Sequence, residues 1–243
     1  ISCWDVVLLT KLQEVRQRSE ELILPLEPED LSLQGMADAS PPKWHLAHTT
    51  WFFETFLLQP FLTGHQACDP RWSYQFNSYY DAVGERHPRP ERGLLSRPGI
   101  SAILAWRHRV DEGLRRLLET PSSELVQLVE LGLQHEQQHQ ELLLMDLLDG
   151  FSRQPLEPCY DTKADLTTAV EERQWLSCSE GLVEIGHRGE GFHFDNESPR
   201  HRVWLDGFEL QSDLVTNGDY EQFIADGGYQ RPELWMSEGW SCC

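Results

Sequence analysis

Positive charge is scarce in this sequence. Lysine occurs only at Lys11, Lys43 and Lys163, and Asp and Glu outnumber Lys and Arg by 40 to 20, which gives a formal net charge of −20. Nucleic acids and anionic membranes are recognised mainly through basic patches. We therefore expect no nucleic-acid partner and no membrane partner, and we interpret the acidic surplus as a solvated surface that favours solubility.

Long apolar runs and a cysteine pattern are also lacking. No run approaches the roughly 18 residues of a membrane-spanning helix, and the opening segment ISCWDVVLL has neither a basic region nor a small-residue cleavage site. We therefore expect a cytoplasmic protein without a secretory signal. The six cysteines are scattered and include no C-x-x-C pair, which argues against a disulfide framework.

Four amphipathic helices are predicted in the first 155 residues. Apolar residues recur at helical spacing between Leu8 and Leu22, and three further patterns cover residues 44–58, 100–119 and 125–148. Pro41-Pro42 suit a helix start, and Pro121-Ser122-Ser123-Glu124 offers an N-cap for the last helix. Gly150 is expected to end that helix. Residues 60–98 are expected to form a loop. The core of the last helix is expected to include Leu131, Met145 and Leu148. Four such helices predict an up-down bundle.

The pattern changes after the bundle. Residues 156–174 are polar and are interpreted as a linker. From Trp175 onward the segments GLVEIGH and HRVWLDGFEL predict short strands, and a short helix capped by Thr216 or Asn217 follows. The expected fold class is therefore α+β, with a four-helix bundle over 1–155, a linker over 156–174 and a second domain over 175–243.

The segment HEQQHQE, His135 to Glu141, is the first candidate for chemistry. Residues four apart on a helix share a face, with Cβ atoms about 5–6 Å apart, so His135 and His139 can bind one metal ion. Gln138 and Leu142 lie on the same stripe, and an imidazole pair on a partly buried face needs a partner. Taken alone, the pair fits a surface or core role better than a metal site.

The segment PPKWHLAHTTWFFE offers a third ligand. His48 shares a helical face with Trp44 and Trp51, whereas His45 lies off that stripe, so we expect His48 to join the pair. Three neutral histidines leave open positions on a divalent ion. Such a site suits a zinc-activated water or an iron(II) that binds substrate and O₂, and the ligand set does not choose between them.

Three motifs carry a family resemblance. The segments WHLAHTTWFFE, FNSYYDAVGERHPRPERGLLSRPG and HEQQHQELLLMDLL resemble the N-terminal DinB-like domain of the ergothioneine-biosynthesis sulfoxide synthases. The segment from Gly181 to Trp240 resembles the opening of their formylglycine-generating-enzyme-like domain, which has a C-type-lectin-like α+β fold. The resemblance implies that this second domain is incomplete here.

The resemblance also implies an activity and a site. Members of the family are non-haem iron(II) oxidoreductases that join the sulfur of cysteine or γ-glutamylcysteine to hercynine with O₂ and form a sulfoxide. By motif position, the Fe(II) ligands are His48, His135 and His139. Gln138 is placed near the substrate imidazole, and Arg86 and Arg89 near the carboxylates of the thiol substrate. The family's catalytic tyrosine is expected beyond Cys243.

Three other hypotheses remain open at this point. A selenoneine synthase has the same architecture but uses a selenosugar. A zinc-dependent DinB-like thiol S-transferase uses a similar three-histidine site in a bundle that stands alone. The third alternative is a metal-binding or structural remnant without activity.

Overall fold

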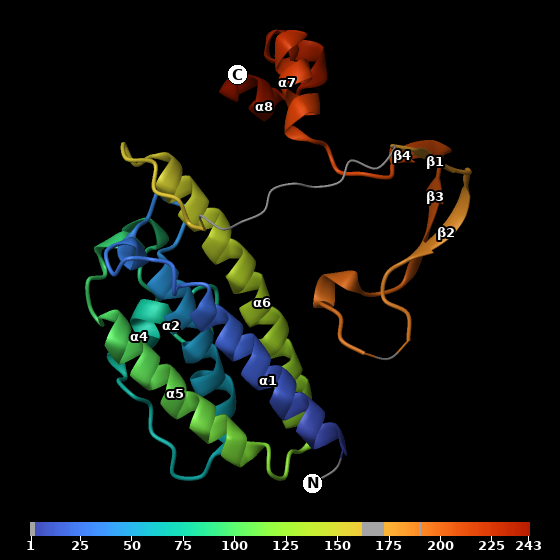
Figure 1. Ribbon diagram of the computed structural model, residues 1–243. Coiled ribbons are helices and arrows are strands. Elements are labelled where there is room, and N and C mark those ends of the chain that lie inside the picture. The colour runs from blue at the N-terminus through green and yellow to red at the C-terminus, as the bar shows by residue number, and fades with distance from the viewer. Residues whose placement is uncertain (1–2, 162–172, 190) are drawn as a thin grey trace. The chain divides into compact units, whose positions relative to one another are not determined.

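Helices build the first part of the chain, and short strands follow in the second part (Figure 1). The computed structural model describes residues 3–161, 173–189 and 191–243, and the chain divides into two units, residues 1–164 and 165–243. The predicted α+β fold class is confirmed. Most of the predicted linker lies outside the described residues.

Four long helices form the bundle of the first unit. They are α1 (Cys3–Glu21), α2 (Pro42–Phe53), α5 (Ile100–Leu117) and α6 (Ser123–Ser152). Helix α2 contacts both α5 and α6, and α1 contacts α6 (Figure 1). Every residue of α2 is buried, so this helix is the centre of the bundle. It continues through a π-helical turn, Glu54–Leu58, into α3 (Gln59–Phe61).

The predicted helix starts are confirmed, but the end of α6 is not. Pro42 begins α2, and the Ser122 hydroxyl accepts a hydrogen bond from the backbone N–H of Leu125 at 3.2 Å. Helix α6 runs past Gly150 and ends at Ser152. A Cβ at Gly150 would lie 2.6 Å from the side chain of Leu33. This glycine therefore permits close packing and does not end the helix.

A second glycine sets the separation of α2 and α6. A Cβ added to Gly132 would lie 2.6 Å from the ring of Phe53, which is tighter than a carbon–carbon contact allows. The absence of a side chain at Gly132 lets the two helices approach closely. This approach brings the histidines of α2 and α6 within reach of one another.

The expected loop over 60–98 contains two short helical segments. These are α4 (Arg71–Phe76) and a 3₁₀ helix, Arg89–Leu94, while a further 3₁₀ turn, Asp30–Ser32, precedes α2. Six residues are too few to show an apolar period in the sequence. Helix α4 is tied to the bundle by Phe76, which is buried with its ring centroid 5.9 Å from that of Trp106.

The expected core positions of α6 were wrong. Leu131, Met145 and Leu148 are 37%, 63% and 72% exposed. The buried face instead contains Glu136, together with Leu125, Val129, Leu133, Leu143 and Leu147. A charged residue lies within this face because two arginines neutralise it, and leucine positions alone did not reveal the rotation of the helix.

Strand pairs and short helices make up the second unit. Strand β1 (Trp175–Cys178) pairs antiparallel with β4 (Phe208–Gln211), and β2 (Gly181–Ile185) pairs antiparallel with β3 (His201–Leu205). The helical segments are Asp195–Glu197, α7 (Asn217–Ala225), Gly228–Gln230, Pro232–Leu234 and α8 (Ser237–Cys242). Thr216 caps α7 and accepts a hydrogen bond from Asp219 N–H at 3.2 Å, which confirms one of the two predicted caps.

Candidate metal centre

His48 is held by aromatic stacking on the buried helix α2. The ring of Trp44, one turn before it, is nearly parallel with a centroid separation of 4.7 Å, and Trp51, one turn after it, lies at 5.6 Å. The His48 Nδ1–H donates to the carbonyl oxygen of Phe76 at 2.6 Å. Since a neutral imidazole carries one proton, Nε2 is left with its lone pair.

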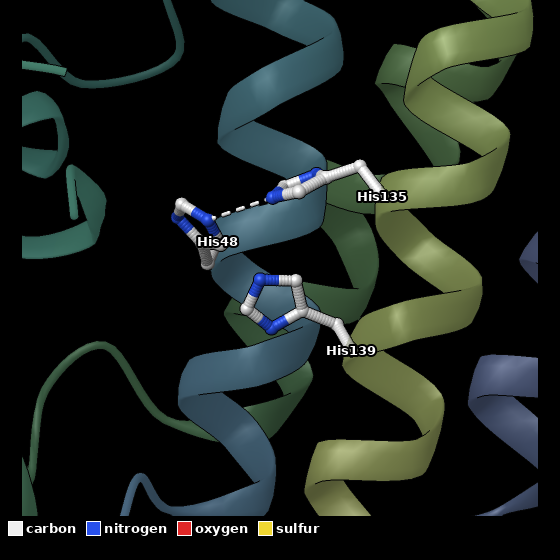
Figure 2. A group of neighbouring side chains, drawn as sticks. All are labelled: His48, His135 and His139. Carbon is white, nitrogen blue, oxygen red and sulfur yellow. Dashed lines mark hydrogen bonds between the residues drawn. The ribbon is translucent and has the colours of Figure 1, made fainter. Parts of the chain in front are cut away.

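The other two histidines of the site lie on α6. His135 and His139 face α2 from adjacent turns, and the three side chains point toward a common space (Figure 2). His48 Nε2 lies 3.2 Å from His135 Nε2. One ring nitrogen from each of the three lies within 4.8 Å of the others. The structure thus brings together the three residues that the sequence nominated.

His45 lies behind this group. Its Nδ1 is 2.9 Å from His139 Nδ1, and its Nε2 is 3.1 Å from Asp146 Oδ2. The side chain is buried, and Asp146 also accepts the backbone N–H of Ser40 at 2.8 Å. His45 therefore contacts His139 at Nδ1. This is the His139 ring nitrogen that points away from the space shared by the three histidines (Figure 2).

Burial keeps these imidazoles uncharged. It lowers the pKa of His48, and the neighbouring His135 lowers it further. The pKa of His139 is lowered by burial and by the nearby His48, while burial lowers the pKa of His135 to about 4. Burial also lowers the pKa of His45. At neutral pH the cluster is neutral, which is the form that binds a metal ion.

The arrangement fits a divalent transition-metal ion. Two imidazole nitrogens each about 2.1 Å from one ion are separated by about 3.0–3.4 Å at tetrahedral or octahedral angles, and the His48–His135 separation is 3.2 Å. His135 Nδ1 is buried without a hydrogen-bond partner among the described residues. Neutral imidazoles suit zinc, copper, iron and nickel, so the donor set fits a metal without identifying it.

A cavity of about 580 Å³ opens beside the three histidines. It contains Gln138 and Leu142, which continue the stripe of His135 and His139 along α6. Tyr79 and Tyr80 contribute aromatic surface from the segment after α4. The volume is that of a small-molecule site, and the three candidate ligand histidines line it.

The two arginines nominated from the sequence occupy different places. Arg89 lines the cavity, donates to the Asp38 carbonyl oxygen at 3.0 Å and contacts the Tyr79 hydroxyl. Arg86 donates to the Ser78 carbonyl oxygen at 2.7 Å and to Asp81 at 3.0 Å, and it is not among the lining residues.

Sequence reasoning missed a third arginine. Arg92 is buried, lines the cavity and lies over Trp44, with its guanidinium carbon 3.4 Å from the ring centroid. It donates to the hydroxyls of Ser40 and Ser78 but forms no ion pair among the described residues. Burial and the adjacent Arg89 lower its pKa to about 9. The three-residue spacing from Arg89, which aligns side chains on a 3₁₀ helix, was the available signal.

Family models match both parts of the chain. Residues 11–143 match the DinB superfamily, and residues 162–242 match the sulfatase-modifying factor enzyme 1-like domain. Among the described residues, no helix is long and apolar enough to cross a membrane.

Curated relatives match nearly the whole chain, across both family regions. The chain is 28% identical over 244 residues to the hercynine oxygenase of Mycolicibacterium smegmatis. That alignment covers 96% of this chain and 54% of the relative. The hercynine oxygenase of Mycobacterium tuberculosis is 27% identical, and that of Mycolicibacterium thermoresistibile is 29% identical. Each alignment covers 96% of this chain, and they cover 54% and 51% of the respective relative. The chain thus spans about half the length of the curated relatives it matches.

The superfamily match covers more than half of the chain, and the second match follows it without overlap. The relatives extend across both matched regions. The chain therefore belongs to the DinB superfamily, and its second domain and its relatives confirm the predicted kinship with the ergothioneine-biosynthesis sulfoxide synthases.

Proposed function

We propose that this chain supplies the iron(II) site of an O₂-dependent enzyme that joins cysteine or γ-glutamylcysteine to hercynine. One observation carries the proposal: three neutral imidazoles converge beside a cavity in a chain whose relatives are hercynine oxygenases. His48, His135 and His139 would hold the iron. Bound iron would supply the redox chemistry that couples O₂ to the two substrates.

The reaction balances with these substrates alone. The thiol S–H and one imidazole C–H are broken, and a C–S bond forms between the two molecules. One oxygen atom of O₂ becomes the sulfoxide oxygen, and the other leaves as water with the two hydrogens. The four electrons taken up by O₂ come from the two substrates, so no further reductant is needed.

The residues of the cavity have distinct roles in this proposal. Gln138 lies on the cavity wall beside the histidine pair and would hydrogen-bond the hercynine imidazole. The tyrosine rings of Tyr79 and Tyr80 would face its trimethylammonium group, because aromatic faces attract such cations. Arg89 and Arg92, with Arg86 nearby, would bind the carboxylates of the thiol substrate, which guanidinium groups recognise well.

The domain assignment is part of the proposal. Residues 1–155 would form the metal-binding bundle, residues 156–174 the linker and residues 175–243 part of the second domain.

Anaerobic reconstitution followed by metal and product analysis tests the proposal. We expect one iron per chain, loss of that iron in His48→Ala, and a hercynine–thiol sulfoxide once O₂ is admitted to the polypeptide that contains this sequence. A seleno product from a selenosugar would indicate the selenoneine reaction instead. Thiol transfer with zinc and without O₂ would indicate the transferase. Absence of any bound metal would refute the site itself.

A further inference from the structure

We infer that His45 and Asp146 form a hydrogen-bonded chain that sets the tautomer of His139 and leaves its Nε2 free for the metal. Two hydrogen bonds make up this chain. One joins Asp146 Oδ2 to His45 Nε2 at 3.1 Å, and the other joins His45 Nδ1 to His139 Nδ1 at 2.9 Å. The inference rests on the proposed function, because it takes His139 as a metal ligand. His45 and Asp146 are positioning residues that act through His139.

The donors and acceptors in these two hydrogen bonds are fixed by the carboxylate of Asp146. Asp146 Oδ2 accepts the backbone N–H of Ser40 at 2.8 Å, and an ionised carboxylate can only accept. The His45 nitrogen that faces this oxygen must therefore carry the ring proton. A neutral His45 then presents a lone pair at Nδ1, so His139 must donate from its own Nδ1. The lone pair of His139 is left at Nε2.

The reverse direction is disfavoured on both sides. It would place the His45 Nε2 lone pair against the carboxylate, and it would put a proton on His139 Nε2, where a metal ion has to bind. The side chain of His45 is only 4% exposed, so water has little access to replace the missing hydrogen bond. A metal-bound histidine commonly donates its second N–H to such a partner, which fixes the orientation of the ring.

The chain also links the two helices of the site. His45 lies on α2, one turn before His48, and Asp146 lies on α6, two turns after His139. The side chains that fix His139 thus come from the same two helices as the three candidate ligands. His48 has an equivalent support in the carbonyl oxygen of Phe76.

Nitrogen-15 NMR of the metal-free full chain at neutral pH tests the tautomer directly. Long-range correlations within each imidazole identify the protonated nitrogen. We expect His139 to be protonated at Nδ1 in the wild type and in Asp146→Asn, because the oxygen held by Ser40 N–H still accepts from His45. Asp146→Leu and His45→Phe should shift His139 toward Nε2 protonation. Asp149→Leu is the matched control, because Asp149 lies on the same helix as Asp146 and pairs with Arg153, the residue that follows the helix.

Titration with Zn²⁺ alone gives a second readout, with thermal melting of each variant to verify folding. Asp146→Leu and His45→Phe should weaken zinc binding about 10- to 100-fold, Asp146→Asn less so, and Asp149→Leu should match the wild type. Nε2 protonation of His139 in the wild type would overturn the inference. Folded Asp146→Leu and His45→Phe with unchanged tautomer and affinity would do the same. If zinc and tautomer results agree but no sulfoxide forms, only the proposed function fails.

Discussion

Glu136 offers the sharpest test of how the bundle is held together. It directly follows His135 on α6, yet its side chain is completely buried on a different face. The carboxylate accepts from Arg16 Nη1 at 3.0 Å, from the Ser19 hydroxyl at 2.6 Å and from Arg107. We predict that Glu136→Gln destabilises the bundle strongly, because it leaves two buried guanidinium groups with too little negative charge.

The expected magnitude follows from the burial of the pair. Removing one partner of a buried ion pair costs about 3–5 kcal/mol, since the other charge remains desolvated. Arg107 is completely buried, and among the described residues its one remaining ion-pair partner would be Glu20, which is 29% exposed and 3.2 Å away. Its other hydrogen bonds go to neutral oxygens. Arg16 keeps Asp111 at 2.6 Å, which reduces its share of the loss. We therefore expect about 3 kcal/mol.

The pKa of Glu136 also indicates that the ionised carboxylate stabilises the fold. Burial alone would raise this pKa, but Arg107 and Arg16 outweigh it and lower the pKa from 4.5 to about 2. A depressed carboxyl pKa contributes stability that is present above the unfolded value and is lost as pH falls toward the folded value. The stability that the ionised Glu136 contributes is therefore lost between about pH 4.5 and pH 2.

Urea unfolding followed by far-UV circular dichroism measures the effect, because the long helices of the first unit dominate the signal. Glu141→Gln on the same helix is the matched control, since its side chain is exposed and such substitutions change stability by less than about 0.5 kcal/mol. A loss below about 1 kcal/mol for Glu136→Gln would refute the reasoning, as would equal losses in both variants.

Three further predictions concern packing, pH and the cavity. Gly132→Ala should lower the free energy of unfolding, measured in urea, by about 1 kcal/mol. Overpacking against Phe53 costs about 1–3 kcal/mol, and the higher helix propensity of alanine returns about 1 kcal/mol. A stabilised variant would contradict the close approach of α2 and α6. The metal-free bundle should lose stability as pH falls from about 6.5 to about 4, because the pKa of His135 is about 4 when folded and the unfolded chain takes up the proton first. Replacing His135 by Gln should reduce the dependence of the melting temperature on pH, and an unchanged dependence would contradict the lowered pKa of His135. Arg92→Met should weaken γ-glutamylcysteine binding by about tenfold in calorimetry and leave zinc affinity unchanged, whereas Arg71→Met, which removes an exposed pair with Asp69, should change neither.

Much of the fold was predictable because its signals are local. Apolar periodicity revealed the four bundle helices. Pro42 and Ser122 marked the starts of two of them, and Thr216 marked the start of α7 in the second unit. The failures have a common cause. Gly150 packs against Leu33 instead of ending α6, and packing between distant segments leaves no local pattern. Helix α4 was missed because it is too short to show a period.

The candidate ligands were predictable for similar reasons. The residues that contact them from other elements were not. A four-residue spacing and a shared helical face brought His135, His139 and Gln138 to one cavity. His45 was set aside because it lies off the stripe of His48, and that offset is what lets it reach His139 from behind. Asp146 and Arg92 were not nominated from the sequence. Their partners lie on other elements, so only the tertiary structure reveals them.

Helix α6 therefore performs two tasks on adjacent faces. Glu136 fixes one face to Arg16 of α1 and Arg107 of α5, while its neighbour His135 presents the other face to His48 of α2. A rotation of α6 about its axis would break the buried ion pairs and separate the histidines together. The free energy that Glu136 contributes to folding thus also holds the imidazole nitrogens in place. We expect Glu136→Gln to weaken zinc binding even under conditions where the variant is fully folded, although its carboxylate touches none of the three histidines.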